Sequence, residues 1–190
     1  MDLLFDTFKA RAEAVSAEVH RVATRGEALD FIVALLRVEG VADVRESRAV
    51  WVEGSLLDGV DRERLAEQIP GLTFRVTQDA AEGSKVGISQ VEWAIANTGT
   101  LVTDAAPVER RLASALPVIH VAVVPTGAIQ PDMPAVFARI HPRQSGYISM
   151  ITGPSRTADI ERVLTIGVHG PSRLVIVFVD GLENTAERVQ

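Results

Sequence analysis

The sequence predicts an α/β fold in which a mainly parallel sheet is sandwiched by helices. Helix-like and strand-like segments alternate along most of the chain, which is the order that produces parallel sheets. Two runs, VIHVAVV and LVIVFV, are almost continuously apolar, as expected of strands that are covered on both faces. The 190 residues, 47% of them hydrophobic, suffice for one core, so we expect a single domain over 1–190.

The first half of the chain shows this alternation directly. Apolar residues at helical spacing predict an N-terminal helix within 1–18 and a second helix, EALDFIVALLRVEGV, that stops at Gly40. Short β-branched and aromatic runs at 48–54 and 72–77 predict strands. The segment between them, DRERLAEQIPG, reads as a helix, so the three segments form a strand–helix–strand unit.

The second half contains more strands, a loop and a tail. The segment 125–134 is rich in proline and is predicted to be a loop, and 182–190 is predicted to be a polar tail. Strands are expected in KVGIS, TGTLVTD, PVIHVAVVP, YISMIT and RLVIVFVD, and helices in VERRLASA and PAVFARIH.

Charge and the N-terminal segment limit the partners and the location of the chain. The formal net charge is −6 and the pI is near 5.2, so the surface repels nucleic acid and anionic lipid. The start, MDLLFDTFKARAEAV, mixes charged with apolar residues and resembles neither a signal peptide nor a membrane span. We therefore expect a cytoplasmic protein.

The chain has no cysteine, and its four histidines are scattered. The absence of cysteine excludes disulfides, thiolate metal sites, iron–sulfur ligation by this chain and a cysteine nucleophile. The histidines show neither HxH nor HExxH spacing, so no two imidazoles are predicted to share a metal ion. We expect no metal site and no cofactor in this chain.

The tetrapeptide Gly-Pro-Ser-Arg occurs at 153–156 and again at 170–173. The first copy lies between YISMIT and TADIERVL, which predicts a turn that opens a helix. The free N–H groups of that helix, with nearby hydroxyl and guanidinium groups, suit an anionic or carbonyl oxygen. Acids in the first turn also satisfy the helix dipole, so a capped helix with nothing bound is the alternative, and helix caps are far commoner than anion sites. Both interpretations stay open for the candidate ligand-binding residues Gly153, Pro154, Ser155, Arg156, Thr157 and Asp159.

The second tetrapeptide leads into RLVIVFVD and is predicted to be a turn ahead of a buried strand. In open parallel sheets, the turns that leave the carboxyl ends of strands line the ligand crevice. By that rule the first copy is the favoured site and the second lies at the opposite edge. His169 and Gly170 join the site only if their loop folds back over it.

Thr98, Gly99 and Thr100 form another turn signature, between two strand-like runs. A plain hairpin explains this turn. Alternatively, the two hydroxyls and the glycine N–H face a substrate and form a polar pocket wall. Arg111, in the charged segment that follows, is a further candidate for binding a carboxylate.

No catalytic residue can be assigned from motifs. His120 lies within an apolar strand and is interpreted as a core histidine with a satisfied ring. His169 and Asp159 are the candidates for moving a proton, although a structural role explains His169 as well. The chain lacks the G-x-S-x-G nucleophile elbow, and GSKVG does not have the spacing of a P-loop.

Three of these stretches carry a resemblance to a known family. VGISQVEWAIANTGTLVTDA, RRLASALPVIHVAVVP and ITGPSRTADIERVLTIGVHGP occur in this order, from Val86 onward. In them the chain resembles the LutC/YkgG family, whose members carry the LUD domain and serve lactate utilisation. Asn97 stands where the family usually has an acidic residue. The resemblance implies a single LUD domain with a fold similar to the NagB/RpiA/CoA-transferase-like group.

The resemblance also implies a role. LutC-like proteins look like one component of a system that oxidises L-lactate to pyruvate, in which cysteine-rich and iron–sulfur partner proteins carry the clusters. This chain would then be an accessory subunit of the complex, or a subunit that binds a small carboxylate or phosphate. The rival hypothesis is a free-standing enzyme on a phosphorylated or carboxylated metabolite, with a sugar-phosphate-isomerase-like or CoA-transferase-like site. The sequence leaves open whether the chain is catalytic.

Overall fold

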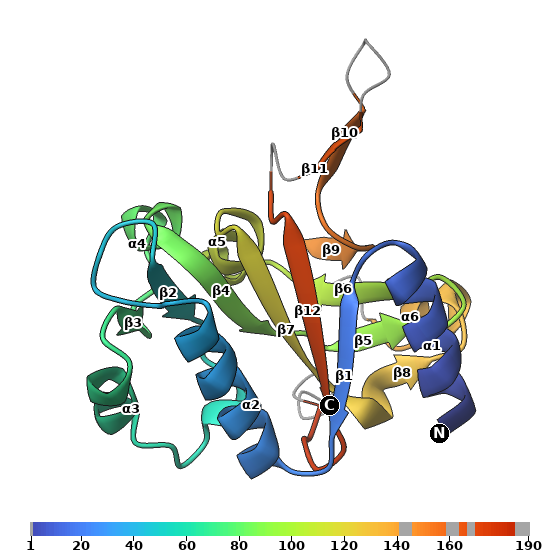
Figure 1. The fold of residues 1–190 in the computed structure, drawn as a ribbon. Coiled ribbons are helices and arrows are strands. Elements are labelled where there is room, and N and C mark those ends of the chain that lie inside the picture. Colours follow the sequence, from blue (N-terminus) through green and yellow to red (C-terminus); the bar gives the residue numbers. More distant parts are fainter. Residues whose placement is uncertain (1, 141–145, 159–163, 167–169, 185–190) are drawn as a thin grey trace.

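The computed structural model describes residues 2–140, 146–158, 164–166 and 170–184 (Figure 1). None of the helices within these ranges is both long enough and apolar enough to span a membrane. The elements are α1 (Asp2–Ala14), β1 (Glu18–Val22), α2 (Arg25–Val38), β2 (Arg48–Trp51), η1 (Ser55–Leu57), α3 (Arg62–Gln68), β3 (Leu72–Thr73), α4 (Gln78–Glu82), β4 (Ser84–Gln90), β5 (Trp93–Ile95), β6 (Thr100–Asp104), α5 (Val108–Ala115), β7 (Ile119–Pro125), η2 (Thr126–Ala128), β8 (Ile129–Gln130), α6 (Met133–Phe137), β9 (Ile148–Ile151), β10 (Arg156–Ala158), β11 (Leu164–Ile166) and β12 (Arg173–Val179).

The central sheet has six strands in the order β1-β12-β7-β4-β2-β3. All five pairings are parallel, which confirms the predicted fold class. The two apolar runs of the sequence are the neighbouring strands β7 and β12, and both are buried along nearly their whole length. We call the side on which these strands begin the amino edge and the side on which they end the carboxyl edge.

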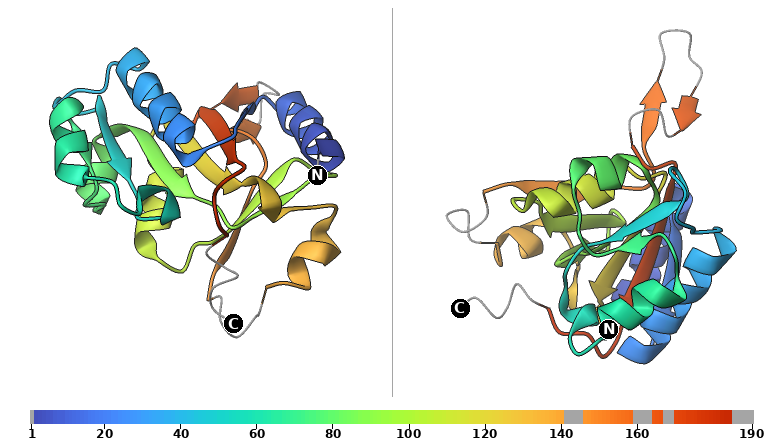
Figure 2. Two further views of the ribbon diagram at one scale, coloured as in Figure 1. Left: turned by 90° about the horizontal axis from the view of Figure 1, so that it is seen from below. Right: turned by 90° about the vertical axis from the view of Figure 1, so that its left-hand side faces the viewer.

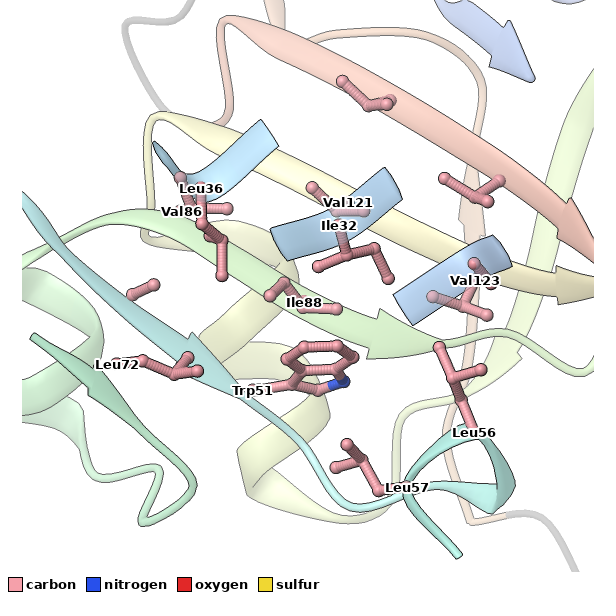
Figure 3. Close-up of a cluster of buried hydrophobic side chains, with 14 of the residues drawn as sticks. Ile32, Leu36, Trp51, Leu56, Leu57, Leu72, Val86, Ile88, Val121 and Val123 are labelled. Atoms are coloured by element: carbon pink, nitrogen blue, oxygen red, sulfur yellow. The ribbon is translucent and has the colours of Figure 1, made fainter. Parts of the chain in front are cut away.

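One face of the sheet packs against α2 and α3. Ile32 and Leu36 of α2 lie over Trp51, Ile88 and Val121 of three strands (Figure 3). Fully burying side chains of this size contributes about 1.5–3 kcal/mol each. The helical spacing read from the sequence of α2 therefore corresponds to the face that supports the sheet.

The other face is covered by α1, α4, α5 and a second sheet of order β8-β5-β6-β9. Phe5 and Phe8 of α1 both place their rings edge-on to Phe178 of β12, with centroids 5.5 and 5.0 Å apart. In the second sheet, β6 is antiparallel to both β5 and β9, whereas β8 is parallel to β5. TGTLVTD and YISMIT thus form strands outside the parallel sheet, and β8 lies within the predicted loop 125–134.

Two predicted boundaries differ from the structure. The N-terminal helix ends at Ala14, and Glu18 already belongs to β1. Between them Ser16 adopts a φ of 71°, in the left-handed region, which an α-helix cannot continue through. At the other end, Leu182 of the predicted polar tail is buried in the core beneath α2.

The prediction that a helix begins at Thr157 is wrong. Residues 156–158 form β10, which pairs antiparallel with β11 at 164–166 and places Thr157 opposite Thr165. The β-branched residues of LTI favour a strand over a helix, and cross-strand pairing supplies the hydrogen bonds that a helix would have supplied. The two strands, which we call the arm, extend away from the body at the amino edge (Figures 1 and 2).

Candidate functional site

The two tetrapeptides lie side by side at the base of the arm. The N–H of Ser155 donates a 2.8 Å hydrogen bond to the carbonyl oxygen of Pro171. A Cβ on Gly170 would stand 3.1 Å from the Cβ of Ser155, so glycine permits this close approach. The first copy therefore lies at the amino edge beside the second, and its predicted place at the carboxyl edge is wrong. The reason is that β9, which precedes it, belongs to the second sheet.

Residues of the first tetrapeptide hold the turn between α1 and β1. Arg156 is exposed, and its Nη2 donates to the carbonyl oxygen of Val15 at 2.8 Å and to Oγ of Ser16 at 3.0 Å. Gly153 has a φ of +77°, and a Cβ there would lie 2.8 Å from the same Val15 oxygen. These groups, predicted to cradle a ligand at a helix start, contact the protein itself.

Arg173, the last residue of the second tetrapeptide, binds two carboxylates, one of them next to the turn between α1 and β1. Arg173 donates from Nε and Nη2 to the carboxylate of Glu18, and from Nη1 to Glu39 at 2.5 Å. Lys85 pairs with Glu39 at 2.9 Å. These hydrogen bonds and charges lower the pKa values of both carboxyl groups. The two copies thus provide two arginines that tie the arm base to residues 15–18.

The turn at Thr98, Gly99 and Thr100 joins β5 to β6 as a hairpin, as the simpler interpretation predicted. Gly99 has a φ of +66°, and a Cβ there would lie 2.5 Å from the N atom of Ala12 in α1. Thr98 is exposed. The backbone of α1 therefore fills the space beside Gly99 that a substrate would have needed.

The two predicted ligand-binding stretches do come together. The hydroxyl groups of Thr100 and Thr152 lie 2.8 Å apart, because β6 and β9 are neighbouring strands. Gly99 and Gly153 both approach the end of α1 closely. These residues pack the base of the arm against the end of α1, so their observed contacts at the amino edge are structural.

The remaining predicted residues lie in different surroundings. Asp159 and His169 lie outside the described residues, and Pro154 is buried. His120 is a core residue as predicted: its Nε2 lies 2.9 Å from Oγ of Ser89, and burial lowers its pKa to about 4. Arg111 donates to the carbonyl oxygen of Ala106 at 3.0 Å and lies over the ring of Tyr147.

Polar side chains that sequence reasoning missed gather at the carboxyl edge. Gln90 ends β4, and Thr126 follows the neighbouring strand β7. Ser55 follows β2, and its hydroxyl reaches Oε1 of Gln90 at 3.1 Å and the carbonyl oxygen of Glu183 at 3.3 Å. Ligands bind beyond the carboxyl ends of parallel strands, so the residues that end β4 or follow β7 are the ones to which that rule points.

Glu92, two residues after Gln90 in the chain, is a buried carboxylate paired with the half-buried Arg110. Glu92 accepts hydrogen bonds from Oγ1 of Thr103 at 2.8 Å, from the N–H of Asp104 at 3.0 Å and from Nη1 of Arg110. Asn184 donates to the backbone oxygen of Glu92 at 2.9 Å. Because both carboxylate oxygens have partners, we interpret Glu92 as a structural link between β6 and α5.

Comparison with known proteins identifies the domain. The family profile of the LUD domain matches residues 5–179. A Lactate utilization protein C from Halalkalibacterium halodurans is 32% identical over 142 residues, which are 72% of this chain and 54% of that protein. Another, from Geobacillus thermodenitrificans, is 38% identical over 107 residues, 53% of this chain and 45% of that one. The chain thus spans about half the length of these curated relatives.

A solved structure shows the same fold. It is the crystal structure of a DUF162 family protein from Deinococcus radiodurans, with a TM-score of 0.57 and 18% sequence identity. The match covers 94% of this chain and 97% of that one.

Proposed function

We propose, from the premise that this chain belongs to the LUD-domain family, that it acts in lactate utilisation as a subunit of the system that oxidises L-lactate to pyruvate. The observation that carries this proposal is the similarity to Lactate utilization protein C, at 32% identity over 142 residues. The similarity extends through most of the domain and includes relatives from several bacteria.

The composition of the chain supports a non-redox role within such a system. Iron–sulfur clusters are held by cysteine thiolates, and the sequence contains no cysteine. The clusters that carry electrons away from lactate would then belong to cysteine-rich and iron–sulfur partner proteins. This chain would be their accessory subunit and would carry no cluster itself.

The arm supports the idea of a partner-binding subunit. An isolated two-stranded hairpin is marginally stable in water, so an arm that extends from the body gains stability when another surface covers it. Its base is fixed to the body through Ser155 and Arg156. We propose that the arm contacts a partner protein of the lactate system.

Affinity purification tests the proposal. The tagged full chain, isolated from its source organism grown on L-lactate, should carry cysteine-rich and iron–sulfur proteins with it. The same purification after growth on glucose is the control. Deleting the gene should slow growth on L-lactate and leave growth on glucose unchanged. Normal growth of the deletion strain on L-lactate, with no paralogue present, contradicts the proposal.

A further inference from the structure

We propose that the carboxyl edge holds a small carboxylate anion, bound by the side-chain amide of Gln90 and the guanidinium of Arg25 with Ser55 beside them. Residues 55–58 bring the two groups into one region, because Ser55 contacts Gln90 while the carbonyl oxygens of Leu56 and Asp58 contact Arg25. The choice of lactate and pyruvate as its occupants rests on the proposed function.

Gln90 is the first observation. Its side chain is buried, with 6% of the residue exposed, yet its Nε2 has no hydrogen-bond partner among the described residues. Ser55 occupies only the other end of the amide. Turning the amide over would leave its oxygen unpartnered instead, so either orientation leaves one polar group free. A buried amide group without a partner is costly, and in native proteins such a group is satisfied by a bound water, ion or ligand.

Gly54 leaves room for this amide. A Cβ at Gly54 would lie 2.7 Å from Oε1 of Gln90 and would displace the end of that side chain. The hydroxyl of Ser55 then fixes the Oε1 end at 3.1 Å. The amide is therefore held from one side, and its Nε2 is left available.

Arg25 is the second observation, and it determines the charge of the ligand. Its Nη2 donates to the carbonyl oxygens of Leu56 at 3.1 Å and Asp58 at 2.6 Å, directly after Ser55 in the chain. Its Nε is buried without a partner. Arg62 also has a buried Nε without a partner, but its Nη2 is paired with Glu53, whereas within the described part of the chain no carboxylate lies within 4.0 Å of the Arg25 guanidinium. A fixed positive charge without a counter-ion favours an anion.

The setting agrees with a ligand site. Ser55 and Gln90 follow or end the adjacent strands β2 and β4, and Thr126 follows β7 next to them. Thr126 is 1% exposed, and its hydroxyl makes no hydrogen bond within 3.5 Å. The same hydroxyl lies close enough to Asp180 to help lower the pKa of that carboxyl group. Asp180 itself is paired with Arg21 at 2.8 Å. Among the described residues, Nε2 of Gln90 and Nε of Arg25 are thus two donors without a partner at this edge.

Calorimetric titration of the full chain with L-lactate, pyruvate and inorganic phosphate, each at millimolar concentration, tests the proposal. The unmodified chain should bind a carboxylate. Gln90→Leu removes the free amide and Arg25→Gln removes the charge, and each should weaken binding about tenfold or more. Gln78→Leu and Arg64→Gln make the same changes on exposed positions of α4 and α3, and they should leave the affinity unchanged.

Three results would overturn the site: no heat with either carboxylate, equal affinity in all four variants, or binding of phosphate alone. Thermal unfolding of each variant without ligand shows whether it folds. Because Gln90→Leu and Arg25→Gln remove different groups, the test still stands if one of the two fails to fold. Purification of partners from lactate-grown cells is read separately. A chain that retains its partners but binds no carboxylate contradicts this inference and leaves the proposed function standing.

Discussion

Arg173 holds Glu18 through two hydrogen bonds, one of them 2.8 Å from Nη2 to Oε2, and so joins the start of β12 to the start of β1. The hydrogen bond and the charge of Arg173 lower the pKa of Glu18 below its usual 4.5. A lowered pKa in the folded state means that this stabilisation is present above pH 4.5 and is lost as the pH falls through the folded value.

Glu18→Gln should therefore reduce the free energy of unfolding at neutral pH by about 0.5–1 kcal/mol. The effect is modest because the two side chains are 36% and 42% exposed, so water screens the pair. Urea denaturation of both proteins above and below pH 4.5 measures the difference. The two proteins should converge at the acid end, and an equal difference at both pH values would contradict the assignment.

Gly99→Ala should destabilise the protein by about 2–4 kcal/mol, because the new methyl group meets the backbone of α1 and the backbone is in a left-handed conformation. Gly127→Ala is the matched control, since nothing lies within 4 Å of a Cβ there, and it should change stability by at most about 0.5 kcal/mol. Thermal and denaturant unfolding measure both. A fully stable Gly99→Ala protein would mean that α1 does not pack on this turn.

Arg156→Ala should lower the free energy of unfolding by about 0.5–1.5 kcal/mol, because two hydrogen bonds to the turn after α1 are lost. Arg45→Ala provides the comparison: Arg45 pairs with Asp79 on an exposed surface, and its loss should cost at most about 0.5 kcal/mol. Hydrogen exchange of Val15 and Ser16 should quicken only in the first variant. Unchanged exchange at these residues would contradict a clamping role.

His120 should make the protein sensitive to mild acid. Burial lowers its pKa to about 4, whereas an unfolded chain has a histidine pKa of about 6.5. Between these values the unfolded chain binds more protons, so stability falls as the pH falls, by up to about 3 kcal/mol.

Unfolding measured as a function of pH checks this prediction for His120. The variant His120→Gln keeps a hydrogen-bond partner for Ser89 without titrating and should lose most of this slope. The ring proton signals of His120 in the native protein should show no titration near pH 6.5. A titration there would contradict the buried, neutral state.

The parallel sheet could be predicted from sequence because its central strands have no polar face. VIHVAVV and LVIVFV cannot be placed at a surface, and the helical spacing of α2 predicts the layer that covers them. The second sheet was not predicted because TGTLVTD and YISMIT look like any other half-buried strands. Nothing in such short runs tells a reader which neighbour each will pair with.

The candidate sites were harder to predict for a related reason. TADIERVL predicts a helix because it has acids in a first turn followed by apolar residues, whereas the pairing of Thr157 with Thr165 depends on a contact between two separate strands. Gln90 and Arg25 cannot be predicted as site residues from the sequence because neither belongs to a motif. Their role follows from lacking a partner in the folded protein, and a sequence does not record that property.

The hydrogen bond from the N–H of Ser155 to the carbonyl oxygen of Pro171, at 2.8 Å, joins the chain just before β10 to the chain just before β12. The two ends of this segment are already in contact, so the length of the segment has little effect on the stability of the domain. Closing a loop twice as long costs only about 0.6 kcal/mol more. Changes between these two residues that keep Arg156 and its hydrogen bonds to Val15 and Ser16 should therefore leave the hydrophobic core undisturbed. The sequence and length of this segment can therefore change in evolution without a change in the rest of the domain, as they do in loops on a rigid scaffold.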